Sequence, residues 1–162
     1  LLSLLSGSDE EVRGYIQKLS ETGTYTVSDR VLRAVQAEFS CGFCTDAQGA
    51  QTIGRTFRES RYLLDTHTAV ACTVLDAYRS GTGDQTLTVV ESTASPFKFC
   101  ASVLDALGVT EHAPGTGVLG QLTAETGRPA PTPLASLAGK PVRFDQVTDR
   151  GDMRAVVTEF LR

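Results

Sequence analysis

The five residues 86–90 (TLTVV) carry the one clear β-strand pattern in this 162-residue chain. A short, β-branched run of this kind is typical of a strand buried inside a parallel sheet. Two other stretches, 61–64 and 142–144, are weaker strand candidates. Because one strand does not make a sheet, we expect an α/β layer fold whose sheet is incomplete and whose pairing strands come from elsewhere.

Helix signals dominate the rest of the chain. Ser8 followed by Glu11 is a capping box, which predicts a helix through about Leu19. Ser28 is the expected cap of a second helix, with apolar residues on one face as far as Phe39. Further helices are expected to begin at Thr45, Thr66 and Ser95, and a last one runs from Asp152 to Leu161.

Two of these expected helices have informative apolar patterns. The helix over 66–79 is apolar around nearly its whole circumference, which predicts that it is buried. The helix over 152–161 is amphipathic and predicts an inward face. That face consists of Met153, Val156, Val157 and Phe160.

Composition excludes several classes of protein. Hydrophobic residues make up 41% and charged residues 21%, as in a soluble globular protein. The net charge of −4 and the mixed charges argue against a nucleic-acid partner, and no apolar stretch reaches the roughly 20 residues of a membrane span. Cys72 and Cys100 lie in apolar stretches and are expected to be buried thiols, which favours a reducing, cytoplasmic location. The chain begins at Leu1 and its only methionine is Met153, so we expect a piece of a longer protein.

The segment 90–99 joins the expected strand to the next helix. Open α/β sheets place their ligands where a strand ends and a helix begins. The hydroxyl residues Ser92, Thr93 and Ser95 stand at this junction, where exposed helix amides add partial positive charge. On position alone they are also explained as turn and cap residues.

Two ordered motifs carry a resemblance to a known family. Residues 64–71 (LDTHTAVA) are followed about twenty residues later by 92–99 (STASPFKF), and this pair resembles the end of threonine synthases. The resemblance implies a helix-rich fragment of the three-layer, tryptophan-synthase-like fold (fold type II) of pyridoxal-phosphate enzymes. It implies that the parent enzyme converts O-phospho-L-homoserine and water into L-threonine and phosphate.

The resemblance also assigns residues. Thr93 matches the hydroxyl residue that hydrogen-bonds the pyridine nitrogen of pyridoxal 5'-phosphate, and Ser92 beside it is a second cofactor-binding candidate. The family's Schiff-base lysine and its Gly-rich phosphate loop lie upstream of these motifs, so no catalytic residue is assigned here. The expected partner is the N-terminal part of the same enzyme, and this chain alone is expected to be inactive. Association into a homo-oligomer stays open.

Four residues are candidates for a place near the substrate: Asp65, His67, Ser95 and Lys98. Asp65 and His67 also fit a helix cap and its first turn. Lys98 is an alternative Schiff-base lysine, but the resemblance places it after the ring-nitrogen residue, which favours a structural or anion-facing role.

Other motifs and functions are weaker. The CGFC run at 41–44 follows a helix rather than the strand that a thioredoxin-type pair requires, and the GTGVLG run at 115–120 follows no strand. With only two histidines no metal site is expected. The alternatives are a dehydratase or sulfhydrylase of the same fold class, or a binding or redox module. We expect one domain, with a helical part (1–60), a core α/β part (61–108) and C-terminal loops and helices (109–162).

Overall fold

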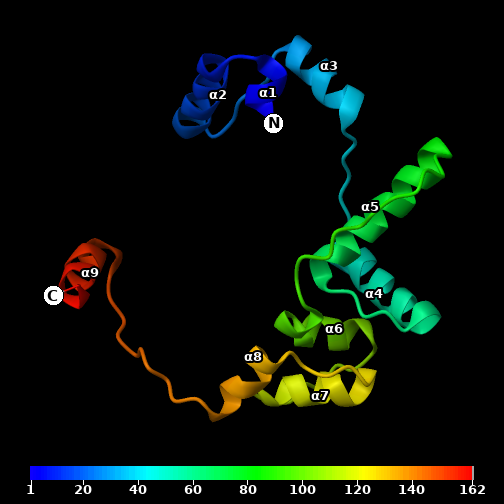
Figure 1. Cartoon of the computed structure of the whole chain (residues 1–162), viewed down its shortest axis with the longest axis vertical. Coiled ribbons are helices and arrows are strands. Elements are labelled where there is room, and N and C mark those ends of the chain that lie inside the picture. Colours follow the sequence, from blue (N-terminus) through cyan, green and yellow to red (C-terminus); the bar gives the residue numbers. More distant parts are fainter. Residues whose placement is uncertain (162) are drawn as a thin grey trace. The chain divides into compact units, whose positions relative to one another are not determined.

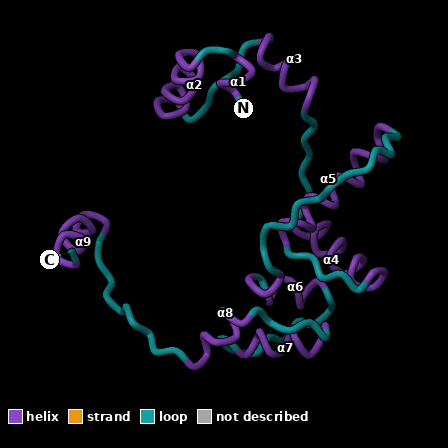
Figure 2. Tube along the Cα trace, in the orientation of Figure 1, coloured by secondary structure: helices purple, strands orange, loops and turns teal. Residues whose placement is uncertain are grey.

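The computed structural model describes residues 1–161, and all regular elements of this part of the chain are helical (Figures 1 and 2). The longer helices are α2 (Asp9–Thr22), α3 (Asp29–Glu38), α4 (Asp46–Ser60), α5 (Thr66–Thr82), α6 (Cys100–Ala106), α7 (Gly117–Thr126) and α9 (Met153–Phe160). The short elements are α1 (Leu2–Ser6), α8 (Thr132–Ala135) and the 3₁₀ turns η1 (Pro96–Lys98), η2 (Ser136–Gly139) and η3 (Arg150–Asp152).

The chain forms two compact units. The first combines Leu1–Thr45 with Val70–Thr88, and the second combines Asp46–Ala69 with the chain from Val89 onward. Helix α5 therefore begins in the second unit and continues in the first. The expected division at residues 60 and 108 stays a prediction.

In the first unit, α1 packs against α2 and α3. The predicted capping box is confirmed, since the Glu11 amide donates to Ser8 Oγ at 3.1 Å. The Glu11 carboxylate accepts bonds from the hydroxyls of Tyr15 and Ser28, and these bonds, with the nearby Arg30 guanidinium, hold its pKa below the ordinary value. One residue therefore joins the starts of α2 and α3.

In the second unit, α6 packs against both α4 and α7. The contact is apolar: Ile53, Phe57, Val103, Leu104 and Leu122 are all buried. Burying side chains of this size stabilises a fold by about 1.5–3 kcal/mol each. This layer is the apolar core of the second unit.

Gly54 lets α4 and α6 approach closely. A β-carbon at this position would lie 2.6 Å from the carbonyl oxygen of Ala106, a backbone atom that cannot turn aside. We predict that Gly54→Ala lowers the free energy of unfolding by about 1–3 kcal/mol, measured by urea denaturation. The matched control is Gly14→Ala in α2, where a β-carbon meets nothing within 4 Å. That variant should gain about 0.5–1 kcal/mol, and equal stability of the two variants would contradict the close approach.

The expected strand at 86–90 is not formed. This stretch is extended but unpaired, and Leu87 and Val89 are 93% and 86% exposed. It is held instead by Arg79, whose Nη2 donates to the Thr86 carbonyl at 3.1 Å and to Thr88 Oγ1 at 3.2 Å. Since a strand is defined by a pairing partner, an apolar β-branched run without one remains a loop. The incomplete sheet is therefore not confirmed within residues 1–161.

The two weaker strand candidates are also loops. Leu63 and Leu64 are buried in the connection between α4 and α5, whereas Val142 and Phe144 are 86% and 73% exposed. Burial of the first pair explains its apolar residues without a sheet. Among the described residues, no strand replaces any of the three.

The helices themselves were predicted better than their burial. Helix α5 forms as expected, but only Thr68 and Ala69 are buried, and Val70 is 40% exposed. The prediction of a buried helix is therefore wrong.

The last helix, α9, also forms as expected. However, the face predicted to turn inward is not covered, since Met153 and Phe160 are 55% and 78% exposed. Within the expected C-terminal loops and helices, residues 112–116 are loop and turn, and Gly117 begins helix α7. None of the helices within residues 1–161 is both long enough and apolar enough to span a membrane.

Candidate functional site

The site is built around the buried carboxylate of Asp65, which lies at the start of α5. Its side chain is 0% exposed. Oδ1 accepts the backbone amides of His67 at 2.9 Å and Thr68 at 3.2 Å. Oδ2 accepts the Thr68 hydroxyl and lies 3.4 Å from the Ser92 hydroxyl. The predicted role of Asp65 as a helix cap is confirmed, and its second oxygen extends the network to a distant segment.

These contacts set the charge state of Asp65. Burial alone would raise the pKa of its carboxyl, because a charged group loses its hydration. The hydrogen bonds from Thr68, His67 and Ser92 outweigh this cost and leave the pKa below the ordinary value of 3.8. The group is therefore an anion at neutral pH, and the amides at the start of α5 add to its stabilisation.

Two arginines, Arg61 and Arg128, hold the segment between α4 and Asp65. Arg61 directly follows α4 and has a left-handed backbone (φ 59°), and its guanidinium lies 4.2 Å from the centroid of the Phe57 ring. Arg128 Nη2 donates to the Arg61 carbonyl at 2.8 Å. No local sequence pattern indicated this bond, because the two residues are 67 positions apart.

The hydroxyl residues of 92–95 have different surroundings. Ser92 Oγ lies 3.0 Å from Thr68 Oγ1, and Ser95 Oγ caps η1 by accepting the Phe97 amide at 3.3 Å. Thr93 is exposed, and its side chain makes no hydrogen bond to the rest of residues 1–161. Ser92 and Ser95 thus have structural bonds, whereas the Thr93 hydroxyl is available for a ligand. The assignment of Ser92 and Thr93 to a cofactor stays a prediction.

The structure places His67 in the first turn of α5 and Lys98 at the end of η1. The exposed His67 ring packs edge to face on Phe99, with centroids 5.1 Å apart. The Lys98 side chain is exposed, and its amide donates to the Ser95 carbonyl at 3.0 Å. Asp65 is buried, which removes it from direct contact with a ligand in this arrangement. The placement of His67, Ser95 and Lys98 near a substrate stays a prediction.

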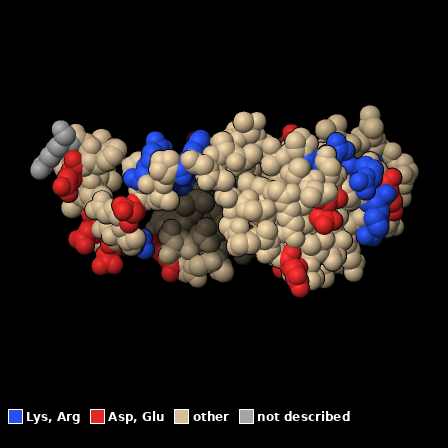
Figure 3. Space-filling view, turned by 90° about the horizontal axis from the view of Figure 1, so that it is seen from below, with Lys and Arg blue, Asp and Glu red and all other residues tan. Residues whose placement is uncertain are grey.

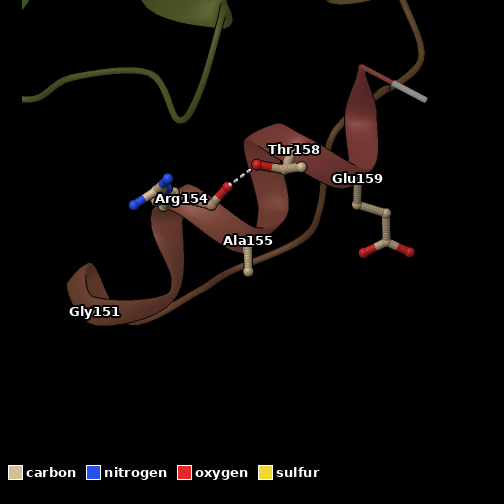
Figure 4. A pocket seen from close by; sticks show the side chains of 5 residues that line it. All are labelled: Gly151, Arg154, Ala155, Thr158 and Glu159. Carbon is tan, nitrogen blue, oxygen red and sulfur yellow. Dashed lines mark hydrogen bonds between the residues drawn. The ribbon is translucent and has the colours of Figure 1, made fainter.

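Two of the hollows in the described part of the second unit differ in their lining. One, of about 300 Å³, is lined by Tyr62, Ser95, Phe97, Arg128 and prolines, and so borders the predicted segment. The other, of about 530 Å³, lies along η3 and α9 (Figure 4). There Thr158 Oγ1 donates to the Arg154 carbonyl of its own helix at 2.8 Å. The second hollow contains none of the residues that the sequence singled out.

The cysteines differ in exposure. Cys100 is buried and its Sγ lies 3.1 Å from the Phe97 carbonyl; burial raises the pKa of this thiol and keeps it protonated. Cys72 is half-buried, so only one of the two expected buried thiols is fully enclosed. Cys41 and Cys44 are free thiols in the loop before α4, and the element before that loop is helix α3. A thioredoxin-type context is therefore missing there.

Within residues 1–161, no three His, Cys, Asp or Glu side chains lie close enough together to hold a metal ion. On the face drawn in Figure 3, acidic and basic side chains both occur, and uncharged residues cover most of the surface.

Comparison with known proteins gives this geometry a context. The family described as "Threonine synthase, C-terminal" matches residues 68–158, which is more than half of the chain. A crystal structure described as pyridoxal-phosphate-bound threonine synthase from Brucella melitensis is similar over 78% of this chain, with 30% identity and a TM-score of 0.56. Threonine synthase-like 1 from human is 26% identical over 68% of the chain, and the mouse protein is 34% identical over 50%.

The helical units, with the capped start of α5 beside the 92–99 segment, thus resemble one part of a threonine synthase. The chain spans 26% of the Brucella protein and 14% of the human relative. It belongs to the threonine synthase family, in which it matches the C-terminal domain.

Proposed function

We propose that this chain is the C-terminal part of a threonine synthase that converts O-phospho-L-homoserine and water into L-threonine and phosphate with pyridoxal 5'-phosphate. The family match and the Brucella structure, whose description names that cofactor, support the proposal. The remaining sequence of such an enzyme supplies the Schiff-base lysine and the loop that binds the cofactor phosphate. That sequence is the main partner of this chain.

The single observation that carries the proposal is the free hydroxyl of Thr93. It is exposed beside Ser92, whose own hydroxyl is engaged with Asp65 and Thr68. A pyridine nitrogen requires one hydrogen-bonding group, and a threonine hydroxyl acts as donor or acceptor. The residues present therefore fit the cofactor ring.

The cofactor, when bound, supplies an electron sink for the substrate carbon atoms. The part of this chain is to orient the ring through Thr93. A neutral hydroxyl does not force the ring nitrogen to stay protonated, as a carboxylate would, and so it moderates the strength of the sink. The hollow beside Ser95 and Arg128 adds a cationic group near the same segment.

The reaction is tested on the full-length protein that contains this chain. With pyridoxal 5'-phosphate and O-phospho-L-homoserine, we predict equal amounts of inorganic phosphate and L-threonine. The control substrates are L-threonine and L-serine with a sulfide source, which test for a dehydratase and a sulfhydrylase. Formation of a 2-oxo acid or cysteine, without release of phosphate, would refute the proposed reaction in favour of those enzymes.

The 162-residue chain by itself is expected to be inactive. Its lysines are Lys18, Lys98 and Lys140, and the proposal gives none of them a covalent bond to the cofactor. After incubation with pyridoxal 5'-phosphate and borohydride, mass spectrometry should find no stoichiometric adduct. A single adduct on Lys98 would instead identify that residue as the attachment site, with Lys98→Arg as its control.

A further inference from the structure

The Asp65 carboxylate uses its two oxygens for different purposes. Oδ1 accepts the amides of His67 and Thr68, which are local bonds within the first turn of α5. Oδ2 faces the hydroxyls of Thr68 and Ser92, and Ser92 lies 27 positions further along the chain. A helix cap requires only the first set of bonds. The second set fixes another segment to the helix.

Resting on the proposed function of Thr93, we propose that Asp65 is a positioning residue: through Thr68 and Ser92, its buried carboxylate fixes the segment that presents Thr93 to the cofactor. Asp65 has no exposed surface, so it acts on a ligand only through other residues.

The hydrogen-bond geometry supports this action. Each hydroxyl has one proton, and the Thr68 proton goes to the carboxylate. The Ser92 proton is then directed to Asp65 Oδ2, at 3.4 Å, or to Thr68 Oγ1, at 3.0 Å. In both cases the ionised carboxylate orients the pair, because charged acceptors form stronger bonds than neutral ones.

Thr93 lies between two fixed points. On one side, its neighbour Ser92 is bound to the network, and adjacent Cα atoms are only about 3.8 Å apart. On the other side, Ser95 is held by the Phe97 amide at its hydroxyl and by the Lys98 amide at its carbonyl. Displacing the Ser92 end by about 1 Å would misplace the Thr93 hydroxyl, and displacements of that size cost up to about a hundredfold in rate.

The decisive variants are Asp65→Asn and Thr68→Val in the full-length protein. Asparagine retains the amide-capping oxygen but loses the charge. Valine keeps the shape of Thr68 and both amide bonds to Asp65 but removes the bridging hydroxyl. With cofactor bound, each variant should lower kcat by about tenfold with little change in KM, and should shift the cofactor absorbance.

A double-mutant cycle then asks whether Asp65 acts through Thr93. If it does, Asp65→Asn and Thr68→Val have little further effect on kcat once Thr93 is valine, because the positioned group is already absent. Additive losses in kcat would overturn the proposed route. If Thr93→Val alone leaves kcat unchanged, the ring contact of the proposed function fails, and the positioning of the segment is decided by the next measurement.

That measurement needs neither cofactor nor turnover. In crystal structures of the cofactor-free protein, the backbone of residues 91–95 should be displaced by about 1 Å in Thr68→Val relative to the wild type. The matched control is Thr123→Val: this threonine is half-buried, and its hydroxyl donates to Leu119 within α7. The control should leave the position of residues 91–95 unchanged. A lower melting temperature without a change in that position, in absorbance or in kcat would reduce Asp65 to a helix cap and overturn the proposal.

Discussion

Thr93→Val is expected to lower the kcat of the full-length protein by about tenfold to a hundredfold. The substitution preserves shape but removes the hydroxyl, and an unsatisfied polar partner in a buried site costs about 1–3 kcal/mol. The reason is that the ring nitrogen would lose its one protein contact from this chain. Steady-state release of phosphate measures the effect, and cofactor absorbance checks that the variant still binds the cofactor.

Thr93→Ser is the control, because it retains the hydroxyl with one methyl group fewer. It should keep most of the turnover. Equal kcat in the wild type and in Thr93→Val would remove Thr93 from the cofactor site, even though its hydroxyl is exposed and free in the structure.

Asp65→Ala is expected to lower the free energy of unfolding at pH 7 by about 2–4 kcal/mol. The variant loses a helix cap, worth about 1 kcal/mol, and leaves the buried Thr68 hydroxyl without its acceptor, at about 1–3 kcal/mol. The exposed Ser92 hydroxyl also loses the carboxylate, but water can replace it there. Urea denaturation of the wild type and the variant measures the difference. The control is Asp145→Ala, at an exposed loop position, which should change stability by less than about 0.5 kcal/mol.

The contribution of Asp65 to the free energy of unfolding should decrease as the pH falls. Its folded pKa lies below the ordinary value of 3.8, so the carboxylate contributes stability above about pH 4. That contribution is lost as the pH falls through the folded pKa, and the difference between the wild type and Asp65→Ala should therefore narrow in acid. A difference that widens on acidification would contradict the hydrogen-bonded anion.

Local signals in the sequence predicted the helices well. The Ser8 and Glu11 capping box, the Ser28 cap and the Asp65 cap are all formed, because each depends on residues within one turn. The helix expected from Ser95 also forms, although it begins as the turn η1 before α6.

Properties that depend on distant neighbours were not predictable in this way. The 86–90 run has strand-forming residues, but pairing requires a second strand, which nothing in a local pattern specifies. The predicted burial of α5 and of one face of α9 failed for the same reason. Periodicity shows which face of a helix is apolar but not what covers it.

For the candidate site, too, the local motifs were recognised from the sequence, whereas their contacts with distant residues were not. The two motifs identified the family, and they contain Asp65, Thr68 and Ser92. Their spacing, however, gave no reason to expect that these side chains form one hydrogen-bonded network, because it closes over 27 residues. Thr68 in particular had no predicted role. Arg128 was missed for the same reason, as its bond to Arg61 spans 67 residues.

The contact between the Thr93 hydroxyl and the pyridine nitrogen of the cofactor can be observed in a crystal structure of the full-length protein with pyridoxal 5'-phosphate. We predict that Thr93 Oγ1 lies within about 3 Å of the ring nitrogen, with Ser92 still bound to the Asp65 network. A ring nitrogen that contacts a different side chain, with Thr93 turned toward solvent, would show that Thr93 does not hold the cofactor.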